Sequence, residues 1–170
     1  MTNNFTISVI TVVYNDYINI VATLASVRLQ KKLFDFEYII IDGLSSDDTV
    51  EAIQQNIDCV DLFLSEEDKG LYDAMNKGLD RASGDGVLFL NAGDTLQGDI
   101  LRHVKTVPCF LPVKYYDYFG NYRKIAIKTE KQAMSNCHQG IVFPNNEIRY
   151  DLEYKISSDY DFFLKHGLNS

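Results

Sequence analysis

A single carboxylate, Asp94, directly follows a short apolar run and is the side chain best placed for chemistry in this 170-residue chain. Residues 87–90 are all apolar, which predicts a strand buried on both faces. Asn91 and two small residues separate that run from Asp94, and small residues let a bulky ligand approach the backbone closely. The sequence therefore puts Asp94 at the carboxyl edge of a sheet, where open α/β folds bind ligands.

Other polar side chains end two further apolar runs. Tyr14 and Asn15 follow the first β-branched run of the chain, and Asp42 ends the second. Because parallel strands end at the same edge of a sheet, we expect these residues to lie near Asp94. Carboxylates and an amide, with Lys69 nearby, suit an anionic ligand held through a divalent cation, which takes carboxylate and phosphate oxygens.

The elements that must position these residues alternate between strand and helix patterns. The predicted strands cover residues 7–13, 37–42, 60–64 and 87–90. The predicted apolar faces of the helices between them are Ile18, Val21, Ala25 and Leu29; Val50, Ile53 and Ile57; and Leu71, Ala74, Met75, Gly78, Leu79 and Ala82. Ser45 and Asp48 fit a capping box for the second helix. This alternation predicts βαβ units and a parallel sheet.

Beyond Asp94 the pattern is less regular. It predicts a short helix at 96–104, a hairpin around Gly120-Asn121 at 115–128, a strand at 139–144 and a helix at 157–166. Two prolines exclude a helix interior at 107–112. On the last helix, Tyr160, Phe163 and Leu164 are expected to face inward. The length predicts one α/β domain over residues 1–170, with a mixed or antiparallel part in its C-terminal half.

Composition excludes several classes of function. A formal net charge of −8 argues against a nucleic-acid-binding surface. The first strand is followed by neither a P-loop nor a G-x-G-x-x-G motif. Cys59, Cys109 and Cys137 are far apart, which favours a reducing cytoplasmic compartment, and Cys59 and Cys109 are expected to fill core or partly buried space. With no signal peptide and no apolar stretch near the roughly 20 residues of a membrane span, we expect a soluble or peripheral protein.

Four segments resemble motifs of the family 2 glycosyltransferases, inverting enzymes with the GT-A fold. They are ITVVYN at 10–15, IIDGLSSDDT at 40–49, KGLYDAMNKG at 69–78 and FLNAGD at 89–94. The similarity is nearly continuous over residues 7–94 and is greatest to the bacterial branch that builds exopolysaccharide and capsule. It implies a three-layer α/β/α fold that moves a sugar from a UDP-, GDP- or dTDP-sugar to a glycan or lipid-linked acceptor in cell-surface polysaccharide synthesis.

The resemblance also implies a donor site in residues 7–94. The implied substrate-binding positions are Thr11, Tyr14, Asn15, Asp42, Lys69, Asp73, Asn76, Asn91 and His138. Among them Asp42 is expected to contact the nucleobase, in a pocket shaped by Tyr14 and Asn15. The positions between 69 and 76 are expected to border the ribose and the donor sugar, and His138 is expected to lie on the acceptor side.

Metal binding and catalysis are assigned in the same way. Asp94 matches the last carboxylate of the family's D-x-D motif, which holds Mn²⁺ or Mg²⁺ on the diphosphate. Asn91 stands where that motif has its first acid, so we expect weaker metal affinity. Asp159 is the implied general base, with Asp161 as the second choice, because inversion needs a base on the acceptor hydroxyl.

Each assignment has a structural alternative. Asp42 can act in a turn, and Asp73 and Asn76 can cap or pack. Asp159 and Asp161 can stabilise a helix start through the dipole alone. For the whole chain, the alternative is a nucleotide-sugar-binding domain without turnover, with residues 95–170 as a shortened acceptor-side half. Peripheral association with the inner face of the membrane and a homo-oligomer are left open.

Overall fold

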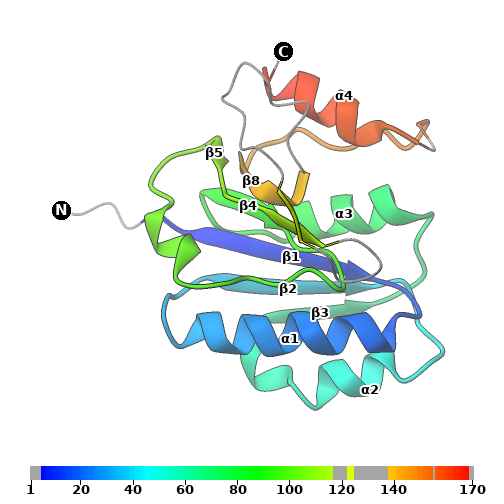
Figure 1. The fold of residues 1–170 in the computed structure, drawn as a ribbon. Helices are drawn as coiled ribbons and strands as arrows, with labels where there is room; N and C mark the ends of the chain where they lie inside the picture. Colours follow the sequence, from blue (N-terminus) through cyan, green and yellow to red (C-terminus); the bar gives the residue numbers. More distant parts are fainter. Residues whose placement is uncertain (1–4, 117–121, 125–137, 155, 169–170) are drawn as a thin grey trace.

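The computed structural model describes residues 5–116, 122–124, 138–154 and 156–168. A central sheet lies between two helical layers, with α1 and α2 on one face and α3 and α4 on the other (Figure 1). Within the described residues, no helix is both long and apolar enough to cross a bilayer. The predicted hairpin turn at Gly120-Asn121 lies outside the described residues, as does Cys137.

The sheet has six strands in the order β3-β2-β1-β4-β8-β5. Their bounds are β1 Ile7–Val13, β2 Glu37–Asp42, β3 Leu62–Ser65, β4 Gly86–Phe89, β5 Cys109–Phe110 and β8 Ile141–Pro144. The first four strands of this order are parallel, whereas β8 runs antiparallel to both β4 and β5. The predicted parallel half and mixed C-terminal half are confirmed. Helices cover both faces, which explains why the central strands are largely apolar.

The strand order creates a topological switch point beside β1. From β1 the chain builds outward through β2 to β3, and β4 then returns to the other side of β1. The loops that follow β1, β2 and β3 all lie at the right-hand end of the sheet in Figure 1. Ligands of open α/β sheets bind where such an order reverses, so the ends of β1 and β4 are the place to look for a site.

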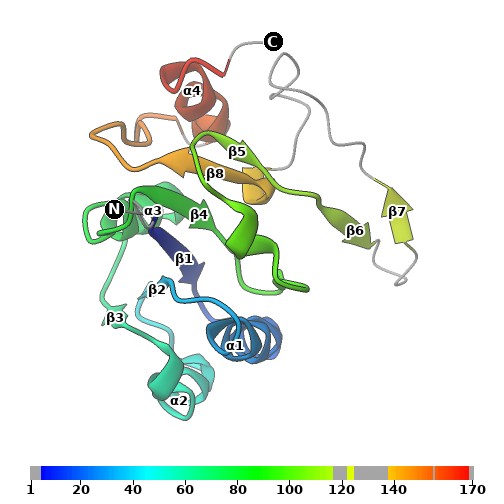
Figure 2. The same ribbon diagram turned by 90° about the vertical axis from the view of Figure 1, so that its left-hand side faces the viewer.

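Helices α2, α3 and α4 are shorter than the sequence pattern predicts, whereas α1 extends beyond its predicted pattern at both ends. Their bounds are α1 Tyr17–Lys31, α2 Thr49–Gln54, α3 Leu71–Leu79 and α4 Ser158–Lys165, with 3-10 turns η1 Ile57–Cys59, η2 Ile100–His103 and η4 His138–Gly140. The helix predicted at 96–104 is only the turn η2. Strands β6 (Lys114–Tyr116) and β7 (Tyr122–Lys124) form the predicted antiparallel hairpin, which lies outside the main sheet (Figure 2).

Helix α1 buries a different face from the one predicted. Ile20, Leu24 and Val27 are fully buried against the sheet. The predicted inward residues are exposed instead: Ile18, Val21, Ala25 and Leu29. The buried face also carries polar residues, Thr23 among them, that bond to the segment after β4. These polar residues made that face look like the solvent side, so the prediction was wrong.

Three smaller predictions about helix faces and caps are also corrected. Ser45 does not cap α2, because its hydroxyl bonds to the Asp42 carboxylate. On α3, Ala74, Met75 and Leu79 are buried as predicted, whereas Leu71 is exposed. Ile57 lies in η1 beyond the end of α2 and is also exposed.

Helix α4 and the cysteines complete the comparison with the predicted core. On α4, Phe162 and Phe163 are buried, while Tyr160 and Leu164 are exposed. Of the three residues predicted to face inward, Phe163 is confirmed, whereas Phe162 takes the place predicted for Tyr160 and Leu164. Cys59 is buried and Cys109 is partly buried, both as free thiols, as the space-filling interpretation predicted.

Candidate active site

The turn that carries Asp94 is held in place by α1. The Thr23 hydroxyl accepts a hydrogen bond from the Gly93 N–H and donates one to the Asp94 carbonyl, both at 2.9 Å. The Asp94 N–H donates to the Asn91 carbonyl at 3.0 Å. Gly93 has a φ of +95°, a conformation that favours glycine. Thr23 was missed by the sequence reasoning, although a polar residue between apolar helix positions was a usable signal.

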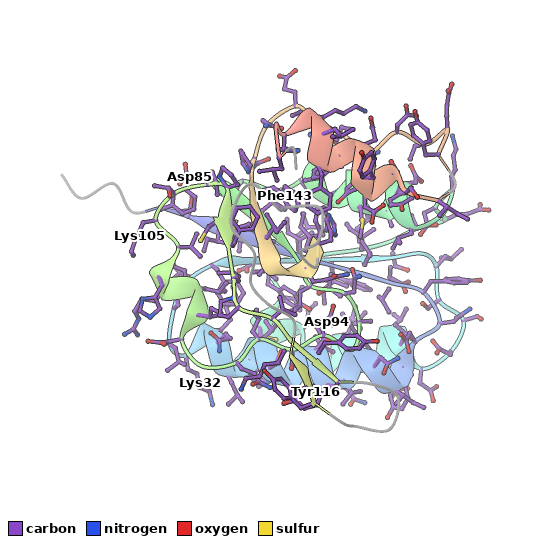
Figure 3. The ribbon with its side chains drawn as sticks, turned by 45° about the horizontal axis from the view of Figure 1, so that its top comes forward. Lys32, Asp85, Asp94, Lys105, Tyr116 and Phe143 are labelled. Atoms are coloured by element: carbon purple, nitrogen blue, oxygen red, sulfur yellow. The ribbon has the colours of Figure 1, made fainter. Side chains whose placement is uncertain are left out.

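Two oxygen-bearing side chains on this turn lack a protein partner. Asp94 makes no ion pair with any described residue, and burial raises the pKa of its carboxyl group. The buried Oδ1 of Asn91 has no hydrogen-bond partner within the described ranges. Figure 3 labels Asp94 beyond the end of β4 and Asp85 before its start. A hard cation prefers oxygen ligands of this kind, so the turn fits a divalent cation whose shell a diphosphate completes.

The protein alone does not provide a complete metal shell here. No group of three or more His, Cys, Asp or Glu side chains that could hold a metal occurs among the residues described. One carboxylate and one amide are consistent with the expected weak affinity, because most ligands must come from the bound substrate or water.

Thr11 lies behind this turn rather than at its surface. Its side chain is fully buried, and its hydroxyl donates to the Leu90 carbonyl at 2.7 Å. The same hydroxyl lies 3.0 Å from the Tyr38 Oη. Thr11 thus ties β1 to the residue just before Asn91 and supports the turn from behind, and its predicted contact with substrate stays a prediction.

Asp42 is fully buried at the end of β2, between two serines. Its carboxylate accepts hydrogen bonds from the Ser45 N–H at 3.0 Å and the Ser65 hydroxyl at 2.6 Å. The Ser45 hydroxyl donates to it as well. Both carboxylate oxygens thus accept hydrogen bonds from the chain, which gives Asp42 a role in shaping the loop after β2, and its predicted contact with the nucleobase stays a prediction.

Tyr14 and Asn15 lie at the end of β1, as predicted, but act differently. Asn15 has a φ of +48°, and its Oδ1 accepts the Ser46 N–H at 2.7 Å. Its own N–H donates to the Ser45 hydroxyl at 2.8 Å. Asn15 therefore fastens the loop after β2 to β1. Tyr14 is 64% exposed, and its ring lies next to Gly43.

The three positions on and before α3 also separate into support and surface. The Asp73 carboxylate accepts the Lys69 N–H at 2.9 Å and lies 3.6 Å from the Lys77 ammonium. The Asn76 amide donates to the Tyr150 carbonyl at 2.9 Å and accepts the Tyr150 N–H at 2.8 Å. Asp73 and Asn76 thus have structural partners, whereas the Lys69 side chain is exposed.

His138 lies in an aromatic cluster on the α3 and α4 side of the sheet. Its ring stacks on Phe89, the last residue of β4, at a centroid distance of 5.2 Å. The Tyr150 Oη lies 2.5 Å from its Nε2. Burial lowers the pKa of His138 to about 4, against the opposing effect of the Asp159 charge. His138 is therefore neutral at pH 7 and serves as a hydrogen-bonding group.

The two acidic candidates on α4 have different surroundings. Asp161 pairs with Lys165 at 2.5 Å, one helical turn away, which raises the pKa of Lys165. Asp159 instead lies 3.5 Å from the Tyr72 hydroxyl of α3 and close enough to His138 to affect its pKa. Asp159 thus faces the aromatic cluster and Asp161 faces Lys165. Tyr72 is a neighbour of Asp159 that the sequence reasoning did not identify.

The arrangement brings two carboxylates toward the end of β4 from opposite layers. Asp94 is held on the α1 side by Thr23. Asp159 lies on the α3 and α4 side, near His138, whose ring stacks on Phe89. This edge of a sheet with a switch point is typical of proteins that bind nucleotide-linked substrates, and the three-layer arrangement is that of a GT-A-like fold.

The chain belongs to glycosyl transferase family 2, because the sequence model of that family matches residues 8–107. It is 32% identical to Uncharacterized glycosyltransferase MT1564 of Mycobacterium tuberculosis, over 99% of this chain and 71% of that protein. It is 26% identical to a PGL/p-HBAD biosynthesis glycosyltransferase of Mycobacterium bovis, over 77% of this chain and 58% of that one. Family membership makes the protein a glycosyltransferase.

Two solved structures share its fold. S. aureus TarS superposes with a TM-score of 0.73 and 21% identity, over 95% of this chain and 33% of TarS. The mannosyltransferase PcManGT from Pyrobaculum calidifontis, solved with GDP-Man and Mn²⁺, superposes with a TM-score of 0.53 and 22% identity, over 64% of this chain and 35% of that one. The chain thus spans about a third of the length of each of these two proteins.

The neutral state of His138 predicts a pH-dependent stability. Its pKa of about 4 is below the ordinary 6.5, so the unfolded chain binds the proton first and stability falls as the pH drops from about 6.5 to about 4. The full difference corresponds to about 3 kcal/mol. We expect His138→Gln to lose less stability over this window than the unchanged protein, measured by urea unfolding at several pH values. Parallel curves for the two proteins would contradict the assignment.

Proposed function

We propose that this protein transfers a sugar, with inversion, from a UDP-, GDP- or dTDP-linked donor to a glycan or lipid-linked acceptor. The observation that carries the proposal is the pair Asp94 and Asp159, which approach the end of β4 from opposite layers in different electrostatic surroundings. A donor diphosphate at Asp94 and an acceptor hydroxyl at Asp159 would leave the sugar between them.

The donor side of the proposal is supported by the Asn91–Asp94 turn. Its two unpartnered oxygen donors would hold Mn²⁺ or Mg²⁺ together with the diphosphate. When bound, such a cation neutralises charge on the departing diphosphate. The GDP-Man and Mn²⁺ of the mannosyltransferase PcManGT support this choice of ligands by analogy of fold.

The acceptor side of the proposal assigns the base to Asp159. Its carboxylate takes the proton of the acceptor hydroxyl while the hydroxyl oxygen bonds to the anomeric carbon. The bond from that carbon to the diphosphate breaks on the opposite face, which inverts the configuration. Asp161 is the weaker candidate because Lys165 already neutralises it. His138, neutral and bonded to Tyr150, lines the acceptor side without exchanging protons.

Five of the predicted site residues then act as support. They are Thr11, Asn15, Asp42, Asp73 and Asn76, whose polar groups are engaged by other parts of the chain. Tyr14 and Lys69 keep exposed side chains and are free to meet the donor. The alternative for this chain, a domain that binds nucleotide sugars without turnover, would use the same donor site in residues 7–94.

The cellular role is proposed on the same basis. The mycobacterial relative is named for PGL/p-HBAD biosynthesis, which supports an acceptor built for the cell surface. We therefore assign the protein to cell-surface polysaccharide or related glycan synthesis in the cytoplasm, at the inner face of the membrane. Peripheral association with that membrane and a homo-oligomer are part of this proposal.

A panel of nucleotide sugars tests the function directly. The donor should raise the melting temperature in the presence of Mn²⁺, since a ligand at 100 times its Kd stabilises the folded state by about 2.7 kcal/mol. Release of nucleoside diphosphate is then measured with candidate acceptors. Stabilisation without any release of nucleoside diphosphate would favour the alternative, a nucleotide-sugar-binding domain without turnover. No stabilisation by any donor would refute the donor site.

A further inference from the structure

An acidic side chain from another loop fills the space beside Gly43, at the end of β2. A Cβ placed on Gly43 would lie 2.5 Å from the Asp68 Oδ2 and 3.3 Å from the Tyr14 Cδ2. Asp68 belongs to the loop between β3 and α3. Its carboxylate therefore takes the position that a side chain at residue 43 would occupy, next to the Tyr14 ring.

The Asp68 carboxylate is held in one orientation. The Gly70 N–H donates to its Oδ1 at 2.8 Å, and Gly70, the residue just before α3, has a φ of +112°. Its other oxygen, Oδ2, has no hydrogen bond to a residue that the structure describes, and the side chain is partly buried. One oxygen is thus fixed by the backbone, and the other is available as an acceptor for a ligand.

Tyr14 provides a flat surface beside that acceptor. Its ring is 64% exposed and lies against the same Gly43 position. Aromatic side chains stack on nucleobases in a manner that tolerates any base, so stacking alone does not select one. Selection needs an accessible group at the edge of the base, whereas Asp42 is fully buried and both of its carboxylate oxygens already accept hydrogen bonds.

We infer that Asp68 determines which nucleobase the donor carries, by accepting a ring N–H of the base with Oδ2. Uracil and thymine offer such an N–H at N3 and guanine offers one at N1, whereas cytosine and adenine have a bare acceptor nitrogen there. The inference rests on the proposed function, since it assumes that a nucleotide binds at this edge. It assigns base selection to a residue in a different loop from the predicted Asp42.

Asp68→Asn tests this inference because it changes one acceptor into a donor without changing shape. The Gly70 N–H requires an oxygen, so the new amide must turn its NH₂ toward the base. We expect the unchanged protein to bind UDP more tightly than CDP, or GDP more tightly than ADP, by at least about tenfold. The same ratio should fall by at least about tenfold in Asp68→Asn, measured by calorimetric titration with Mn²⁺.

Glu67→Gln is the matched control, because it removes the same charge from an exposed neighbour in the same loop. Its affinity ratios should equal those of the unchanged protein, and thermal unfolding checks that both variants are folded. If nucleoside diphosphates bind but Asp68→Asn keeps the original ratio, the inference is overturned and the proposed function stands. If the unchanged protein binds no nucleoside diphosphate, both are overturned.

Discussion

Replacing Asp94 with alanine is expected to abolish manganese-dependent binding of nucleoside diphosphate while the chain stays folded. Asp94 is the one carboxylate of the turn after β4, so its loss removes the charge that attracts the cation. A loss of at least about 100-fold in affinity is expected, the upper end of the range for partners outside the ligand shell. Calorimetric titration of UDP and GDP with and without Mn²⁺ measures it.

The stability of this variant provides a second readout. Burial raises the pKa of Asp94 above its unfolded value, so its favourable contribution exists only at acid pH and is lost as the pH rises through the folded pKa. At neutral pH the charged carboxylate therefore does not stabilise the folded state. Removal of its charge in Asp94→Ala should not lower the melting temperature.

Two further substitutions are compared with Asp94→Ala, one as a control and one that should strengthen metal binding. Asp99→Ala removes an exposed carboxylate of the following segment, which pairs with Arg102 and His103, and should leave metal-dependent binding unchanged. Asn91→Asp adds a second carboxylate to the turn and should tighten Mn²⁺ binding by roughly tenfold. Unchanged nucleotide affinity in Asp94→Ala would refute the proposed metal position.

Asp159→Asn is expected to remove sugar transfer while donor binding is preserved. The amide cannot accept the proton of the acceptor hydroxyl, and loss of a general base typically costs about 10²- to 10⁴-fold in rate. The Tyr72 hydroxyl can still donate to the amide oxygen, so local packing should be maintained. Steady-state transfer and calorimetric donor binding are measured on the same preparation.

Asp161→Asn is the matched comparison on the same helix turn. It breaks the ion pair with Lys165 at the surface, which contributes at most about 1 kcal/mol, and should leave the transfer rate nearly unchanged. The opposite pattern, with transfer lost in Asp161→Asn and retained in Asp159→Asn, would move the base to Asp161. Equal loss in both variants with weakened donor binding would indicate a structural effect of α4.

The parallel half of the fold could be predicted from sequence because its signals are local. A strand covered on both faces is largely apolar, and β1, β2 and β4 are such runs apart from a few polar residues such as Ser8 and Thr11. Residues at the ends of those runs must share one edge, which located Asp94 without any knowledge of contacts. The weaker pattern after Asp94 reflects short strands whose pairing partners lie far away in the chain, as β8 pairs with β4.

The roles of individual site residues were decided by the tertiary structure. Asp42 has a structural partner in Ser65, 23 residues later, which no local pattern encodes. Asn76 is explained by the Tyr150 backbone, 74 residues away, which no local pattern encodes. Asp68 reaches the Gly43 position only because β3 pairs beside β2 and carries its following loop to the same edge.

The sequence by itself determined the layered fold and the sheet edge at which Asp94 lies, because hydrophobic period and strand ends are properties of neighbouring residues. Only the tertiary structure decided which face of α1 is buried, since both faces carry apolar residues and the polar Thr23 on the buried face bonds to the turn after β4. It also separated Asp159 from Asp161, because their difference lies in the groups that face them, Tyr72 and Lys165, and not in their own chemistry.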